Sequence, residues 1–94
     1  MAVKPSLQRT LNDTTPTHLN EFSETDIYYG VTVNFSVSLP FHVGGANTVT
    51  NSGSTRGALM PAGVYSLPIG PDDDLWLIAP AGTSPVLETF ATSI

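Results

Sequence analysis

Residues 31–41 read VTVNFSVSLPF, and they decide the fold class of this chain. The odd positions are all apolar, and the even positions are Thr, Asn, Ser, Ser and Pro. A period of two places side chains on opposite faces of a strand, whereas a helix with about 3.6 residues per turn cannot satisfy it. We therefore expect a half-buried strand, which ends or lies at a sheet edge near Pro40 because proline has no N–H to donate.

The chain keeps this character from residue 27 onward. Further short apolar stretches are separated by Gly/Pro/Asp turns about every ten residues; they are residues 58–60, 64–69, 75–79 and 86–91. The stretch 75–79 is apolar on both faces, which is typical of a central strand. We predict an all-β domain over residues 27–94, with the fold of a small β-sandwich or barrel.

Residues 1–26 have a different composition. They hold six of the eleven charged residues, and Pro5 and Pro16 interrupt any regular element. This composition fits a disordered leader, but a polar stretch of this kind can also become ordered by lying on another molecule. We expect an extended N-terminal arm over residues 1–26 that contacts a neighbouring subunit through its apolar residues, Val3, Leu7, Leu11, Leu19 and Phe22.

Length and residue usage exclude several function classes. A chain of 94 residues allows one small domain. The absence of cysteine excludes a disulfide framework, a thiolate metal site and a cysteine nucleophile. A net charge of −5 with three basic residues offers no electrostatic footprint for nucleic acid. No apolar run approaches the roughly 20 residues of a membrane span, so we expect neither nucleic acid nor membrane as a partner.

The chemistry-bearing residues predict no catalytic site and no cofactor. His18 and His42 have no Ser or Asp partner at a telling spacing, and no HExxH or Gly-x-Ser-x-Gly motif is present. We therefore expect that the protein is not an enzyme. Asp72 and Asp74, in the run Asp72-Asp73-Asp74, could offer oxygen ligands to Ca²⁺ or Mg²⁺. Consecutive residues on an extended chain point in opposite directions, so the three carboxylates cannot all face one ion. We expect a solvated turn there and no metal.

A shortage of charge is the most informative feature of the composition. Between residues 27 and 71 the sole charged residue is Arg56, whereas about a quarter of the residues of an ordinary soluble domain are charged. Such a surface is typical of a subunit that its neighbours cover, because desolvating charge is costly. We expect Arg56 at a contact, together with Trp76, whose place between two leucines favours a core or interface position. We also expect a homo-oligomer, with a trimer favoured.

Three segments resemble small β-rich virion proteins of tailed bacteriophages: AGVYSLPI at residues 62–69, DLWLIA at residues 74–79, and Gly82-Thr83. The resemblance implies a non-enzymatic structural subunit of the virion, assembled in the host cytoplasm, with the major capsid protein or other virion subunits as partners. A head decoration (cement) protein is the first expectation, and a neck, head-to-tail, tail or baseplate subunit is the alternative. A different class, a carbohydrate-binding module, would use Trp76 with the tyrosines Tyr28, Tyr29 and Tyr65.

Overall fold

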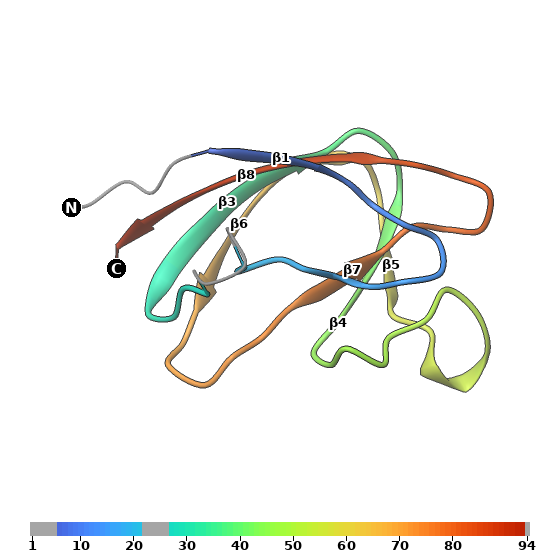
Figure 1. Ribbon diagram of the computed structural model, residues 1–94, viewed down its shortest axis with the longest axis horizontal. Helices are drawn as coiled ribbons and strands as arrows, with labels where there is room; N and C mark the ends of the chain where they lie inside the picture. The colour runs from blue at the N-terminus through green and yellow to red at the C-terminus, as the bar shows by residue number, and fades with distance from the viewer. Residues whose placement is uncertain (1–5, 22–26, 94) are drawn as a thin grey trace.

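The strands form two four-stranded antiparallel sheets in the computed structural model, which describes residues 6–21 and 27–93 (Figure 1). The first sheet has the order β1 (Leu7–Thr10), β8 (Val86–Ser93), β3 (Val31–Val37), β6 (Gly63–Ile69). The second has the order β2 (Thr17–His18), β7 (Trp76–Ile78), β4 (Phe41–Gly44), β5 (Ala58–Met60). A short 3-10 turn, η1 (Gly53–Thr55), lies between β4 and β5. The prediction of an all-β fold is confirmed, and the two separate sheets identify it as a sandwich.

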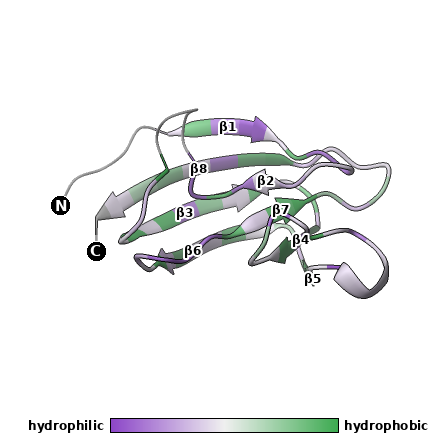
Figure 2. Cartoon of the chain, turned by 60° about the horizontal axis from the view of Figure 1, so that its bottom comes forward, coloured by the Kyte–Doolittle hydropathy of each residue, from purple (hydrophilic) through white to green (hydrophobic). Residues whose placement is uncertain are grey.

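The strand predicted from its alternating sequence lies inside the first sheet. The residues of β3 alternate between buried and half-buried over their whole length, and Figure 2 shows the matching alternation of hydropathy. β3 pairs with β6 on one side and with β8 on the other. The stretch 31–41 is nevertheless not one strand, because it turns after Val37 and Phe41 begins β4 in the other sheet. Leu39, which the alternation placed inside, is therefore exposed.

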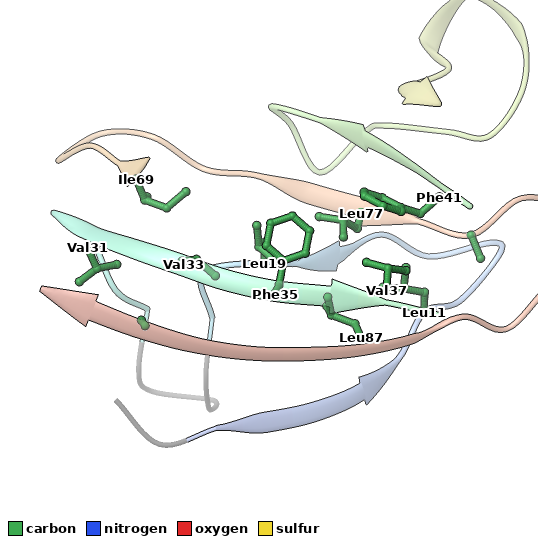
Figure 3. Close-up of a cluster of buried hydrophobic side chains, with 12 residues drawn as sticks. Leu11, Leu19, Val31, Val33, Phe35, Val37, Phe41, Ile69, Leu77 and Leu87 are labelled. Atoms are coloured by element: carbon green, nitrogen blue, oxygen red, sulfur yellow. The ribbon is translucent and has the colours of Figure 1, made fainter. Parts of the chain in front are cut away.

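The hydrophobic core fills the space between the two sheets (Figure 3). The rings of Phe35, Phe41 and Tyr65 contact one another across it, with centroid separations of 5.3 Å for Phe35–Tyr65 and 5.5 Å for Phe41–Tyr65. Leu77 of β7, a strand expected to be central, is fully buried. Burying a side chain of this size contributes about 1.5–3 kcal/mol, so this layer accounts for much of the stability of the fold.

Residues 6–21 belong to the sandwich itself, which corrects the expectation of an extended arm. β1 pairs with β8, and β2 pairs with β7. Leu11 and Leu19 are buried in the core, with 1% and 0% of their surface exposed. Contrary to the prediction, they are therefore not available to a partner. The stretch is polar on average, so its composition did not indicate that two of its leucines are buried between the sheets. Val3 and Phe22 lie outside the described residues.

Candidate interaction surface and the His18 cluster

Two consecutive strands, β5 and β6, form open edges on the same side of the sandwich. β5 is an edge of the second sheet and β6 is an edge of the first. The chain around them, residues 57–71, contains no charged residue, and we call it the uncharged edge. Leu59 and Val64 on it are 62% and 83% exposed. Exposed apolar side chains on an open sheet edge are typical of a surface that another chain covers.

β6 is longer and more regular than the other edge strands. It has seven residues, whereas β1 has four, β5 has three and β2 has two. Its register with β3 runs unbroken from Val31 opposite Ile69 to Val37 opposite Gly63, so the pair contains no bulge. Long, unbulged edges leave a row of backbone groups free to pair with another strand, and natural proteins usually protect them. Pro68 is the one protective residue within β6.

A shallow hollow of about 270 Å³ adjoins this edge on the outer face of the first sheet. Val64 lines it together with Phe90 of β8 and Asn34 of β3. Phe90 is also among the exposed large apolar residues, at 42%. The hollow thus combines apolar side chains, those of Val64 and Phe90, with polar ones that include the carboxylate of Glu88.

The opposite side of the sandwich, formed by β1 and β2, is closed by Arg9. Its Nη1 donates to the carbonyl of His18 at 2.7 Å, and its Nη2 donates to the carbonyl of Leu19 at 3.2 Å. Burial lowers the pKa of Arg9 below its ordinary value, and the nearby Glu21 carboxylate opposes that shift. A charged side chain thus links β1 of one sheet to the β2 segment of the other, a contrast with the open β5–β6 side.

His18 lies at the centre of a polar cluster that sequence patterns did not reveal. Its Nε2 lies 2.8 Å from Oδ1 of Asp74, and its Nδ1 lies 3.4 Å from Oε2 of Glu21. The β2–β7 register sets His18 opposite Trp76, and the two rings stack with centroids 4.2 Å apart and planes 2° from parallel. One face of Trp76 is therefore covered by the imidazole, and the indole is half-buried.

Asp74 connects this cluster to an exposed tyrosine. The hydroxyl of Tyr29 donates to Oδ1 of Asp74 at 3.1 Å. The hydrogen bond from His18 is the largest cause that lowers the pKa of Asp74 below 3.8, and the bond from Tyr29 acts in the same direction. The same carboxylate raises the pKa of Tyr29, first through that hydrogen bond. The cluster is therefore arranged to keep Asp74 ionised.

The three consecutive carboxylates serve different contacts. Asp72 is exposed, Oδ2 of Asp73 accepts the N–H of Gly70 at 3.1 Å within the turn, and Asp74 joins the His18 cluster. Among residues 6–21 and 27–93, no group of three or more His, Cys, Asp or Glu side chains is placed to hold a metal ion. The turn at Gly70 is thus held by a local hydrogen bond from its own N–H back to the carboxylate of Asp73.

The remaining predicted contact residues lie in different parts of the structure. Leu7 is half-buried on β1, facing the core. Arg56 is exposed and immediately precedes the uncharged edge. The pairing of His18 with Asp74 was missed because 56 residues separate them, and the sequence contains no local signal that joins them.

No family model, no curated protein and no solved structure matches the chain. Among the described residues, no helix is long and apolar enough to cross a membrane. Function is therefore inferred from the geometry of this chain and from its own residue patterns.

Proposed function

We propose that this chain is a non-enzymatic structural subunit that attaches to other protein subunits through its uncharged edge. One observation carries the proposal: residues 57–71 lack charge and form two open strand edges from which Leu59 and Val64 protrude. Covering such a surface removes apolar area from water without the large penalty of desolvating charged groups. The net charge of −5 is carried by other segments, which stay hydrated in this arrangement.

The assembly that we propose is a phage particle, with the outside of the head as the first position. The resemblance of residues 62–69 and 74–79 to small virion proteins supports this choice, and the first of these segments contains β6. A cement subunit that binds only the assembled lattice stabilises it by mass action, and many weak contacts add through multivalency. The major capsid protein is then the partner. A neck, head-to-tail, tail or baseplate subunit would use the same surface.

The test is whether the chain is part of a particle. Particles from the source of the gene are purified by density-gradient sedimentation, and the chain is quantified by mass spectrometry. We expect a fixed number of copies per particle for the natural chain. Val64→Asp places a carboxylate on the uncharged edge and should greatly reduce incorporation. Thr10→Asp places the same group at an exposed position of β1 and should leave incorporation unchanged.

Two results would overturn the proposal. One is that particles sediment normally while all of the chain stays in the unsedimented fraction. The other is equal incorporation of the Val64→Asp and Thr10→Asp variants, which would show that the uncharged edge is not the contact. Circular dichroism and thermal melting of both purified variants establish first that each of them is folded.

A carbohydrate-binding module is a second candidate, because Asp74 and His18 link two of the aromatic residues that it would use, Tyr29 and Trp76. Tyr29 is 43% exposed, and its hydroxyl donates to the carboxylate of Asp74. The same carboxylate contacts His18, whose imidazole stacks on the ring of Trp76. Aromatic rings beside a carboxylate offer the stacking surface and the acceptor that sugars need. The imidazole that covers one face of Trp76 leaves at most the other face for a sugar.

Fluorescence titration tests this second candidate directly. Trp76 is the sole tryptophan, so any emission change reports on this cluster. We would expect saturable quenching or a spectral shift with at least one polysaccharide, and its loss in Tyr29→Ala. An unchanged spectrum across a panel of neutral and acidic polysaccharides would eliminate this candidate.

A further inference from the structure

One hydrogen bond just beyond the strand ends determines toward which neighbouring strand the backbone groups of β3 point. The N–H of Ser38 donates to the carbonyl of Val86 at 3.1 Å, which extends the β3–β8 ladder by one residue. Residues of an antiparallel strand bond alternately to the neighbour on either side. The even-numbered residues of β3 therefore bond to β8, and its odd-numbered residues bond to β6.

The register carries this alternation onto β6. Val33 lies opposite Leu67 and Phe35 lies opposite Tyr65, so the odd-numbered residues of β6 bond to β3. The backbone groups of Val64, Ser66 and Pro68 then point away from the sheet. Pro68 has no N–H to donate. Because its backbone groups point outward, the pairing of β6 with β3 loses no hydrogen bond at this residue. The free edge thus presents the N–H groups of Val64 and Ser66 and the carbonyls of all three residues.

We propose that β6 pairs antiparallel with β6 of a second copy of this chain, about a two-fold axis at Tyr65. In this register Val64 faces Ser66 of the second copy, and Ser66 faces Val64. Each pair exchanges two N–H···O bonds, so every outward N–H of the strand is satisfied. Pro68 lies at the end of the pair, where its missing N–H matters least. The two first sheets become one continuous sheet.

The charge distribution is compatible with a second copy as the occupant of this edge. Two copies each carry a net charge of −5 and repel one another wherever acidic segments approach. The uncharged edge lets them meet without that repulsion, and it contains the longest edge strand, β6. The other edges fit less well, since β2 and β5 are two and three residues long and the β1–β2 side is closed by Arg9.

This inference rests on the proposed function for the use of the edge as a contact. It assigns the β6 half of the uncharged edge to a second copy, which leaves the β5 half for a different subunit. A two-fold pair gives a dimer in place of the trimer that we expected from sequence. Edge-to-edge addition of strands is an established way in which proteins associate, with main-chain hydrogen bonds giving the affinity.

Light scattering of the full chain over a range of concentrations tests the dimer. We expect a mass twice that of the 9.9 kDa chain, falling to the monomer mass on dilution. Ser66→Pro removes an outward N–H and should give a monomer at every concentration. Pro68→Ser adds an outward N–H and should keep the dimer to lower concentration. A natural chain that is monomeric throughout would overturn the inference.

A matched control exists on β1. The N–H of Leu11 donates to the carbonyl of Pro85 at 2.8 Å, and the β1–β8 register continues to this pair. Odd-numbered residues of β1 therefore bond to β8, and the N–H of Gln8 points outward like that of Ser66. Gln8→Pro makes the same backbone change on the other edge and should leave the dimer intact. A dimer that is lost in Gln8→Pro but kept in Ser66→Pro would contradict the inference.

Disulfide trapping supplies a second measurement that does not depend on the proline variants. Residue 65 of each copy lies opposite itself in a pair whose Cα atoms are about 4.5 Å apart, within the range of a disulfide. The chain has no cysteine, so Tyr65→Cys should give a covalent dimer on oxidation. Leu67→Cys, two residues from the axis, should not. Equal cross-linking of both variants, or of neither, would overturn the register.

These outcomes separate this inference from the proposed function. A monomeric chain whose incorporation into particles is lost in Val64→Asp would reject the second copy and keep the edge as a contact with another subunit. If the natural chain is a dimer that Ser66→Pro abolishes, but the chain is absent from particles, the inference of a β6 dimer stands and the proposed structural role in the particle is rejected.

Discussion

Nε2 of His18 lies 2.8 Å from Oδ1 of Asp74, although 56 residues separate the two in the sequence. His18 belongs to β2 and Asp74 precedes β7, the strand with which β2 pairs. The hydrogen bond therefore continues the pairing of these two strands beyond the backbone ladder. Because β2 has two residues, side-chain contacts of this kind are a substantial part of what holds it to the sheet.

Asp74→Asn should lower the free energy of unfolding by about 0.5–1 kcal/mol, a modest value because the carboxylate is 36% exposed. The pKa of Asp74 is lowered in the folded protein, so its contribution is present above the ordinary value of 3.8 and is lost as the pH falls through the folded value. Urea unfolding near neutral pH and below that range measures this. The difference between the two proteins should vanish in acid, whereas exposed Asp72→Asn should have little effect at either pH.

Arg9→Met should destabilise the fold by about 1–3 kcal/mol, because the carbonyls of His18 and Leu19 lose the hydrogen bonds from the guanidinium. Arg9→Lys should have an intermediate effect, since one ammonium does not reproduce a planar group with several donors. Chemical denaturation measures both variants. Arg56→Met is the control on an exposed arginine and should stay within about 0.5 kcal/mol of the natural chain. Equal effects of the two methionine variants would show that Arg9 does not tie the sheets.

Leu19→Ala should destabilise the protein by about 2–5 kcal/mol, the usual effect of truncating a fully buried leucine. Leu59→Ala should change stability little, because that side chain is 62% exposed. Thermal or urea unfolding distinguishes them. A small effect at Leu19 would mean that residues 6–21 are an arm after all.

Gly57→Ala should destabilise the fold by about 1–3 kcal/mol, because its Cβ would lie 2.6 Å from the carbonyl oxygen of Val43. Gly45→Ala is the control: its Cβ would have an ordinary contact with the backbone oxygen of Asp74 at 4.0 Å. Its unfolding free energy should be close to that of the natural chain. Comparable losses in both variants would place the cause in the flexibility of glycine and not in the close approach.

The alternation in residues 31–37 predicted a strand correctly because its period depends only on which residues face the core. The same rule went wrong at Leu39, which is exposed, whereas Phe41 is buried as the alternation predicts but lies on a strand of the other sheet. Both continue the pattern in sequence, but the chain turns after Val37 and Phe41 enters the other sheet. A pattern of period two cannot show that a strand has passed from one sheet to the other, since both sheets bury alternate residues.

Residues 6–21 show the limit of composition as a guide. Their charges and prolines resembled those of a polar arm, yet Leu11 and Leu19 are completely buried. Two apolar residues in a polar stretch are enough when each reaches a core that other strands have already formed. Which residues supply that core is decided by strand order and not by the local sequence.

The sequence by itself determined the all-β class and the lack of charge at residues 57–71, because both are properties of local residue order. The tertiary structure alone decided that this segment forms open sheet edges, and that His18, Asp74 and Trp76 meet. Strand order and register join residues far apart in the chain. The free energy that selects them is summed over the whole core, and no local pattern records it.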